Sequence, residues 1–196
     1  MMKLCDLLEM EYYNKGSNIA NNQQNNKCIF FLKQGSVKII DSKTGIVKYV
    51  VKKGNIFGEL SIYDKLAASE EIAIALEDVV ICYIETELME RLMEKHKSLK
   101  NGLLKIYGLR IRKLENRLQD LLYKDSTQRI TEFIGAYIEQ FGEVKGDKIV
   151  AKNLLSHKDV ANLTSTSRQT VNNVLSTMRK DGVIDYNSKF ISNTRT

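Results

Sequence analysis

The side chains best suited to recognise another molecule by hydrogen bonds lie close together in one short stretch that follows Ser167. They are Arg168, Gln169, Thr170, Asn172 and Asn173. An arginine offers a planar fork of donors that matches guanine O6 and N7, and the amides of glutamine and asparagine match adenine N6 and N7. Ser167 and Thr170 lie where a helix would begin, and hydroxyls and backbone N–H groups at that end of a helix hold phosphate. These residue types favour contact with nucleic acid.

Two short helices joined by a tight turn, over residues 156–175, are expected to position these side chains. Ser156 and Asp159 make a variant capping box, in which the shorter carboxylate replaces the usual glutamate, and Ser167 caps the second helix. Apolar residues fill the angle between the two helices: Val160, Ala161, Leu163, Val171, Val174 and Leu175. An ordinary helical hairpin with a polar surface is the alternative. The caps, the turn length and the adjacent basic charge favour a DNA-binding helix-turn-helix.

The neighbouring sequence extends this motif to a winged helix-turn-helix over residues 125–196. Gly182 is the expected C-cap of the second helix, and residues 187–189 form the turn of a hairpin that would be the wing. Upstream, Asp125 or Ser126 caps a further helix with one apolar face. That face carries Ile130, Phe133, Ile134, Tyr137, Ile138 and Phe141. The cap marks the expected domain boundary and hinge.

An apolar residue recurs at alternating steps of three and four through about residues 99–122. The recurring positions are Leu104, Tyr107, Ile111, Leu114, Leu118 and Leu121. Charged residues fill the other faces, so the stripe is as narrow as the seam of a two-stranded coiled coil. Packing of this helix on its own domain, or binding of another kind of partner, are the alternatives. Pairing of two copies is the favoured interpretation, and the seam therefore predicts a homodimer.

Short strand patterns separated by turns extend from Tyr12 to about Ile84. Runs at residues 28–32, 36–40 and 47–51 are rich in β-branched and aromatic residues. Glycines lie where the strands must reverse: Gly35, Gly45, Gly54 and Gly58. Glycine tolerates the positive φ that tight turns often require. A small antiparallel β-roll, or jelly roll, is therefore expected.

These patterns predict an α+β chain in three parts: residues 1–98 as a β-roll sensor domain, 99–124 as a dimerisation helix and hinge, and 125–196 as the winged helix-turn-helix. Charge is unevenly placed, since residues 1–96 carry 12 Lys and Arg against 14 Asp and Glu, whereas residues 97–196 carry 18 against 10. The formal net charge of +6 thus divides into −2 and +8. The basic half favours a polyanionic partner, with a solvated basic face as the alternative.

Metal and iron–sulfur centres are not expected from the cysteines and histidines. Cys5, Cys28 and Cys82 are scattered, and His96 and His157 have no paired ligand spacing. An iron–sulfur cluster of the four-cysteine type would lack one ligand. The sequence names no cofactor.

Enzymatic chemistry and a membrane location are not indicated either. Ser156, His157 and Asp159 are the residue types of a catalytic triad, but near neighbours on one helix cannot form that relay. No apolar run reaches the roughly 18 residues of a membrane span. Asp6 interrupts the N-terminal stretch before the apolar core that a signal peptide needs. A cytoplasmic protein that is not an enzyme is expected.

The order of these features resembles the catabolite activator/FNR (CRP/FNR) family of bacterial transcription regulators, and the likeness extends over nearly the whole chain. The most specific matches are Gly-Asn-Ile-Phe-Gly-Glu-Leu at residues 54–60 and Thr-Ser-Arg-Gln-Thr-Val at residues 166–171. The resemblance implies a cyclic-nucleotide-binding-type roll and a long helix that pairs two subunits. It also implies a winged module that binds an inverted repeat in double-stranded DNA and contacts RNA polymerase.

The roll departs from family members that bind cyclic nucleotides. In those members an Arg-Ser or Arg-Thr pair follows the Gly-Glu-Leu motif and holds the cyclic phosphate, whereas the corresponding residues here are Ser69 and Glu70, followed by Glu71. Carboxylates would repel the phosphate. The resemblance places an effector pocket at Gly58, Glu59, Leu60, Ser69 and Glu70. We expect an effector other than cyclic AMP, or none; haem or nitric-oxide sensing, and a cyclic-nucleotide-binding module that controls another protein, are alternatives.

The recognition helix departs from its relatives at one position. Gln169 stands where many relatives have glutamate in the pattern Ser-Arg-Glu-Thr-Val. Glutamate accepts a hydrogen bond from cytosine N4, whereas glutamine prefers the adenine edge. The DNA half-site is therefore expected to differ at that base pair.

Overall fold

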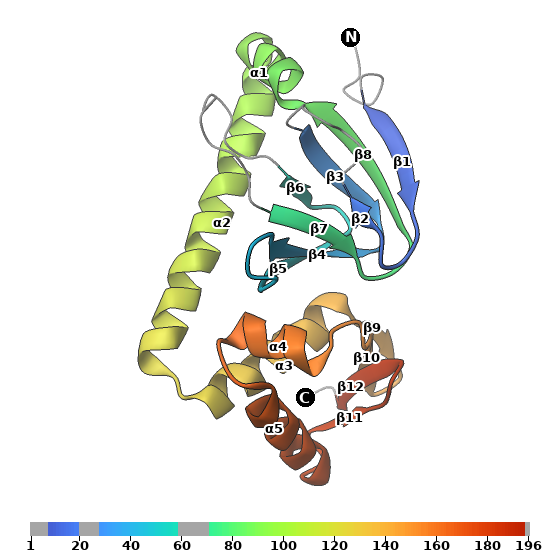
Figure 1. Ribbon diagram of the computed structural model, residues 1–196, viewed down its shortest axis with the longest axis vertical. Coiled ribbons are helices and arrows are strands. Elements are labelled where there is room, and N and C mark those ends of the chain that lie inside the picture. The colour runs from blue at the N-terminus through green and yellow to red at the C-terminus, as the bar shows by residue number, and fades with distance from the viewer. Residues whose placement is uncertain (1–7, 20–27, 59–70, 195–196) are drawn as a thin grey trace. The chain divides into compact units, whose positions relative to one another are not determined.

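The computed structural model describes residues 8–19, 28–58 and 71–194. Figure 1 shows strands over much of the N-terminal part of the chain, a long helix in the middle and a mixed helical and strand region towards the C-terminus. Across those three ranges, no helix has both the length and the apolar character that crossing a bilayer requires. The predicted mixed fold of roll, long helix and helix-turn-helix is confirmed.

The chain divides into two compact units, residues 1–113 and residues 114–196. The boundary lies inside the longest helix, α2 (Lys97–Tyr123), so each unit contains part of that helix. The assignment of separate roles to the roll, the dimerisation helix and the winged module stays a prediction.

The described residues of the first unit form two four-stranded antiparallel sheets. In spatial order, one sheet consists of β1 (Glu9–Tyr13), β8 (Val79–Glu85), β3 (Cys28–Gln34) and β6 (Ile56–Gly58). The other consists of β2 (Asn18–Ile19), β7 (Glu71–Ala75), β4 (Ser36–Asp41) and β5 (Val47–Lys52). The three strand runs predicted from the sequence lie within β3, β4 and β5. The predicted antiparallel β-roll is therefore confirmed.

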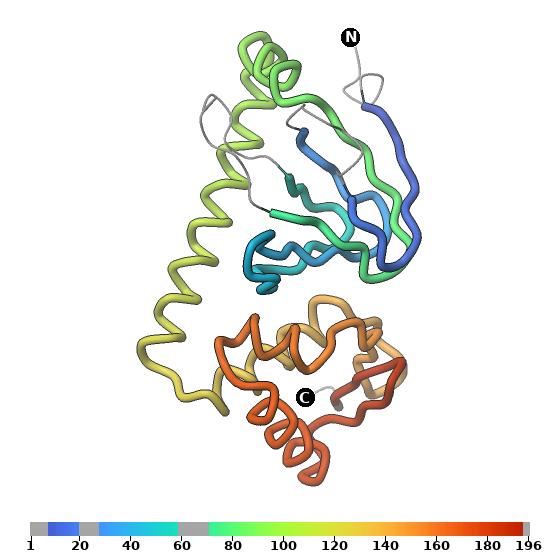
Figure 2. The backbone as a smooth tube through the Cα atoms, in the orientation of Figure 1, coloured from blue at the N-terminus to red at the C-terminus, as the bar shows by residue number. Residues whose placement is uncertain are grey.

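Alternation of side chains along β3 gives the roll two apolar clusters. Phe30 lies in the core formed by residues of both sheets, where its ring stacks on that of Phe57 at a centroid distance of 5.1 Å. Ile29 belongs to a second cluster, together with residues of α1 (Thr86–Lys95) and with Leu103 of α2. Successive residues of a strand point to opposite faces. One face of this sheet therefore packs into the core of the roll, and the other packs against residues of α1 and α2. Figure 2 traces the path of these helices.

The second unit combines the end of α2 with three further helices and a four-stranded sheet. The helices are α3 (Ser126–Phe141), α4 (His157–Thr164) and α5 (Arg168–Lys180). In spatial order, the strands are β11 (Ile184–Tyr186), β12 (Phe190–Thr194), β10 (Lys148–Lys152) and β9 (Glu143–Lys145). Buried apolar residues of all three helices and of β10, β11 and β12 form the core of this unit.

The ends of these elements largely follow the sequence signals. Asp125 caps α3 in a capping box with Gln128. The backbone N–H of Asn187 donates to Phe190 O at 2.9 Å, which closes the predicted hairpin between β11 and β12. Helix α5 has Asp181 as its C-cap, and Gly182 follows with a φ of 71°. The predicted cap position is thus displaced by one residue, because the left-handed residue of such an ending lies just beyond the cap.

Candidate nucleic-acid interface and sensor region

Helix α4 begins at the predicted capping box. The hydroxyl of Ser156 accepts from the backbone N–H of Asp159 at 3.1 Å, and the Asp159 carboxylate accepts from the backbone N–H of Ser156 at 2.9 Å. Five of the six residues predicted to fill the angle between α4 and α5 are buried, namely Val160, Ala161, Val171, Val174 and Leu175, and Leu163 is half-buried. The local signals therefore place two helices in contact, as a helix-turn-helix requires.

The turn between α4 and α5 is held by backbone and hydroxyl contacts. Ser165 adopts the left-handed conformation with φ and ψ both 53°. The backbone N–H of Thr166 donates to Ala161 O at 2.9 Å, and the hydroxyl of Thr164 donates to Val160 O at 2.8 Å. These contacts return the chain to the end of α4 and set the point where α5 begins.

Ser167 caps α5 as predicted, and the polar residues of the first turns lie on its outer side. The Ser167 hydroxyl accepts from the backbone N–H of Thr170 at 3.0 Å, and the two hydroxyl oxygens lie 2.8 Å apart. Arg168, Gln169, Asn172 and Asn173 are exposed, and Thr170 is half-buried. The Gln169 amide donates to Asn173 Oδ1 at 3.0 Å. All six predicted DNA-binding residues are thus brought together at the start of one helix.

The Arg168 side chain has no partner inside the described part of the chain. Its exposed guanidinium makes no hydrogen bond or ion pair with residues 8–19, 28–58 or 71–194. It extends from the first turn of α5, where the helix dipole is positive. A planar cation in this position is available to a guanine edge or to phosphate.

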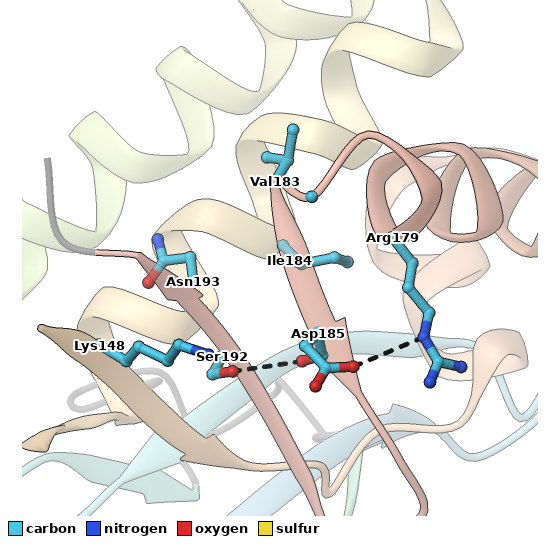
Figure 3. A pocket seen from close by; sticks show the side chains of 8 residues that line it. Lys148, Arg179, Val183, Ile184, Asp185, Ser192 and Asn193 are labelled. Carbon is cyan, nitrogen blue, oxygen red and sulfur yellow. Dashed lines mark hydrogen bonds and ion pairs between the residues drawn. The ribbon is translucent and has the colours of Figure 1, made fainter.

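The wing is connected to the end of α5 around a hollow of about 300 Å³ (Figure 3). Arg179 Nε lies 3.5 Å from Asp185 Oδ1 of β11, and its guanidinium lies 5.4 Å from the ring centroid of Tyr186. The hydroxyl of Ser192 on β12 donates to Asp185 O at 3.5 Å. Arg179 thus links the end of α5 to β11 through Asp185 and Tyr186.

The predicted seam on α2 is largely exposed. Leu104, Ile111, Leu114, Leu118 and Leu121 have between 42% and 59% of their surface exposed. Tyr107 differs, since it is half-buried and packs against the roll cluster that contains Leu103 and Met89. The helix therefore packs on its own roll through Leu103 and through Tyr107, one of the six seam positions, and the other five seam residues are exposed in the described structure.

Gly58 is the one predicted pocket residue that the structure describes; Glu59, Leu60, Ser69 and Glu70 lie outside the described residues. Gly58 has a φ of +99°, and a Cβ atom there would lie 2.5 Å from the Phe30 ring and 2.6 Å from Cys28 O. Any other side chain would clash with β3 and strain the backbone. Gly58 thus has a packing role in the roll whether or not it contacts an effector.

Glu71, which immediately follows the predicted phosphate position, is bound by groups of its own chain. Its carboxylate accepts from the Tyr49 hydroxyl at 2.9 Å and lies 2.5 Å from Lys48 Nζ and 4.0 Å from Arg110 Nη2. The Arg110 guanidinium also stacks 4.5 Å from the centroid of the Tyr49 ring. Burial raises the pKa of the Tyr49 hydroxyl, with Arg110 opposing and Glu71 adding to the shift. The hydroxyl therefore stays protonated and donates to Glu71.

Sequence reasoning identified Glu71 but missed its partners on β5 and α2. Lys48 and Tyr49 lie on a strand that is not hydrogen-bonded to β7, and Arg110 lies on the long helix. Opposite charges at distant positions give no periodic pattern in one sequence, so no signal was available. The arrangement satisfies the carboxylate with two cations and a hydroxyl.

The described cysteines do not form a reactive or metal-binding centre. Cys28 and Cys82 are buried and form no disulfide within the described ranges. Burial, with a smaller contribution from Glu85, raises the pKa of Cys28 to about 11, which keeps the thiol protonated near neutral pH. No group of three or more potential ligand side chains capable of holding a metal occurs within the described ranges.

Both units match models of known protein families. A family model for the cyclic nucleotide-binding domain matches residues 10–96, and one for the Crp-like helix-turn-helix domain matches residues 128–194. The chain belongs to the CRP/FNR family. As a CRP/FNR protein it is a transcription regulator with a DNA-binding helix-turn-helix. The family resemblance stated from the sequence is thereby confirmed.

Named relatives of this CRP/FNR regulator are similar over most of its length. The global nitrogen regulator of Synechococcus elongatus is 24% identical, over 94% of this chain and 85% of that protein. A regulator of Mycobacterium tuberculosis named as CRP-like and cAMP-activated is 23% identical, over 83% and 74%. The solved structure of FixK2 from Bradyrhizobium japonicum shares the fold, with a TM-score of 0.78, 15% identity, and coverage of 96% of this chain and 93% of that one. The two named relatives are regulators, not enzymes.

Proposed function

We propose that the protein acts as a homodimer that binds an inverted-repeat DNA site through the outer side of α5. The observation that carries this proposal is the exposed polar group at the capped start of α5, with Arg168 unpaired among the described residues. Arg168 would form a fork with a guanine, and Gln169 would contact an adenine. Ser167 and Thr170 would hold a phosphate together with the first backbone N–H groups.

The exposed stripe on α2 supports pairing of two chains. Its positions from Leu104 to Leu121 extend over about 25 Å, at about 1.5 Å per residue. Five exposed leucine and isoleucine side chains over such a length are rarely left in water. The alternating steps of three and four fit the a and d positions of a parallel coiled coil. Two-fold pairing would place the two α5 helices about 34–36 Å apart, one turn of B-DNA. An inverted-repeat operator follows from that symmetry.

We infer further that the roll does not bind cyclic AMP in the manner of the cAMP-activated relative. The family position of the phosphate carries Ser69 and Glu70. The next residue in the sequence, Glu71, already forms ion pairs with Lys48 and Arg110. A cyclic phosphate entering there would meet carboxylates. The proposal includes a contact with RNA polymerase, which rests on family membership.

Selection of DNA sites from a random library by the purified full chain, with no small molecule added, tests the proposal. We expect enriched sequences to be inverted repeats whose half-sites are centred about 10–10.5 base pairs apart. Sedimentation of the protein alone should give the mass of two chains. Enrichment of single half-sites, or no enrichment, would contradict the proposal.

A further inference from the structure

The C-terminal end of α4 is held by two arginines from other helices. The last carbonyl groups of a helix have no partner inside it, and α4 has no basic residue in its own last turn. Arg129 of α3 donates through Nε to Thr164 O at 3.0 Å and through Nη2 to Ser165 O at 3.3 Å. Arg117 of α2 donates to Asn162 O at 3.3 Å. Both arginines therefore cap the helix that leads into the recognition turn.

The same Arg129 side chain also binds the link between α2 and α3. Its Nη1 donates to Lys124 O at 2.6 Å, at the first residue after α2. Lys124 Nζ in turn lies 2.6 Å from Asp120 Oδ1 of α2 and 2.5 Å from Glu132 Oε2 of α3. All three nitrogens of the Arg129 guanidinium are thus used on three carbonyl groups. Only arginine presents donors in three directions from one planar group.

The turn that Arg129 holds contains a residue in an unfavourable conformation. Ser165 is the one residue other than glycine with positive φ within the ranges that the structure describes. A side chain with a Cβ adopts this conformation only where surrounding contacts maintain it. Arg129 binds the carbonyl of Ser165 and the carbonyl before it. Ser167, the cap of α5, follows two residues later.

We propose that Arg129 is a positioning residue for DNA recognition, which fixes the turn between α4 and α5 to the end of α2. The direction in which Arg168 extends then depends on the dimerisation helix, without any contact of Arg129 with DNA. The inference rests on α5 reading DNA, which is part of the proposed function. Arg129 is half-buried and donates to three carbonyl groups, so its guanidinium binds groups of the protein and not DNA phosphate.

Equilibrium binding of Arg129→Gln to a selected site and to random DNA tests this role. We expect about a tenfold or greater loss of affinity for the selected site, because three charge-assisted hydrogen bonds are lost, and nearly unchanged affinity for random DNA. Hydrogen exchange should become faster at the amides of residues 164–168 and stay unchanged in α3 around Ile134. Arg91→Gln, which removes an exposed charge from α1, is the matched control and should behave as the unmodified protein.

Arg129→Lys keeps the charge but has one ammonium group, so we expect it to recover only part of the specific affinity. Full recovery by lysine would overturn the proposal, as would equal loss on both DNAs with a weaker salt dependence, which is the sign of a lost phosphate contact. Arg168→Ala is measured in parallel. If that variant keeps full specific affinity, α5 does not read DNA and the proposed function fails; if only the Arg129 variants keep it, the positioning role alone fails.

Discussion

In α5 the guanidinium of Arg168 extends from the first turn without a partner among the described residues, whereas in the roll the carboxylate of Glu71 is bound by Lys48, Arg110 and the Tyr49 hydroxyl. The charge of Arg168 is thus available to a ligand at the surface, whereas the charge of Glu71 is already paired with groups of the same chain. An unpaired cation retains its attraction for an incoming anion, while an ion pair must be broken before either member binds a ligand. The difference supports the proposal that this protein binds DNA through α5.

The charge of each half agrees with that contrast. Residues 97–196 have a formal net charge of +8, and residues 1–96 have −2. A basic surface raises the rate and affinity of binding to DNA through long-range attraction and release of counterions. A slightly acidic roll gives a cyclic phosphate no such attraction. The contrast can be tested by changing the dimer contact, the DNA-reading side chain and the roll in turn.

Disruption of the α2 seam should produce the largest effect. Leu118→Glu would place two carboxylates opposite each other in the paired helices, and the dimer should dissociate. Each monomer would then hold only one half-site, so site-specific affinity should fall by about 10²-fold or more. Sedimentation measures the first effect and fluorescence anisotropy with labelled operator measures the second.

Leu109→Glu is the matched control for that experiment. Leu109 is 49% exposed on the same helix, but it lies on the side opposite to the predicted seam. This variant should stay dimeric and bind the operator normally. A Leu118→Glu protein that sediments as a dimer would remove the seam from the interface.

Truncation of the recognition side chain should produce an intermediate effect. Arg168→Ala should weaken binding to the cognate site by about 1–3 kcal/mol, because a fork of two hydrogen bonds to one base is lost. Binding to random DNA should be nearly intact, and substitution of the contacted base pair should no longer matter to the variant. Competition between cognate and random DNA measures both. Equal losses on the two DNAs would show that Arg168 touches only the backbone.

Parts of the molecule that depend on nearby residues were predictable from the sequence. Ser156 and Asp159, like Ser167, act on backbone groups three residues away, so their caps are visible as short patterns. Strand alternation and the steps of α2 likewise repeat over short distances. The ion pairs of Glu71 and the carbonyl contacts of Arg129 join distant segments, and their geometry depends on packing that no local pattern records.

The smallest effect is expected for the roll. Cyclic AMP should not bind measurably to the unmodified chain, and its addition should not change the affinity for DNA. A cyclic phosphate needs a cation or several N–H donors, because an unpaired buried charge costs several kcal/mol. Ser69 offers one hydroxyl, and Glu71 occupies Lys48 and Arg110. Titration calorimetry should show no binding to the unmodified chain, and measurable binding after Ser69→Arg is combined with Glu70→Ser. Micromolar binding by the unmodified chain would mean that its phosphate position lies elsewhere, and that the internal pairing of Glu71 does not close the roll to anions.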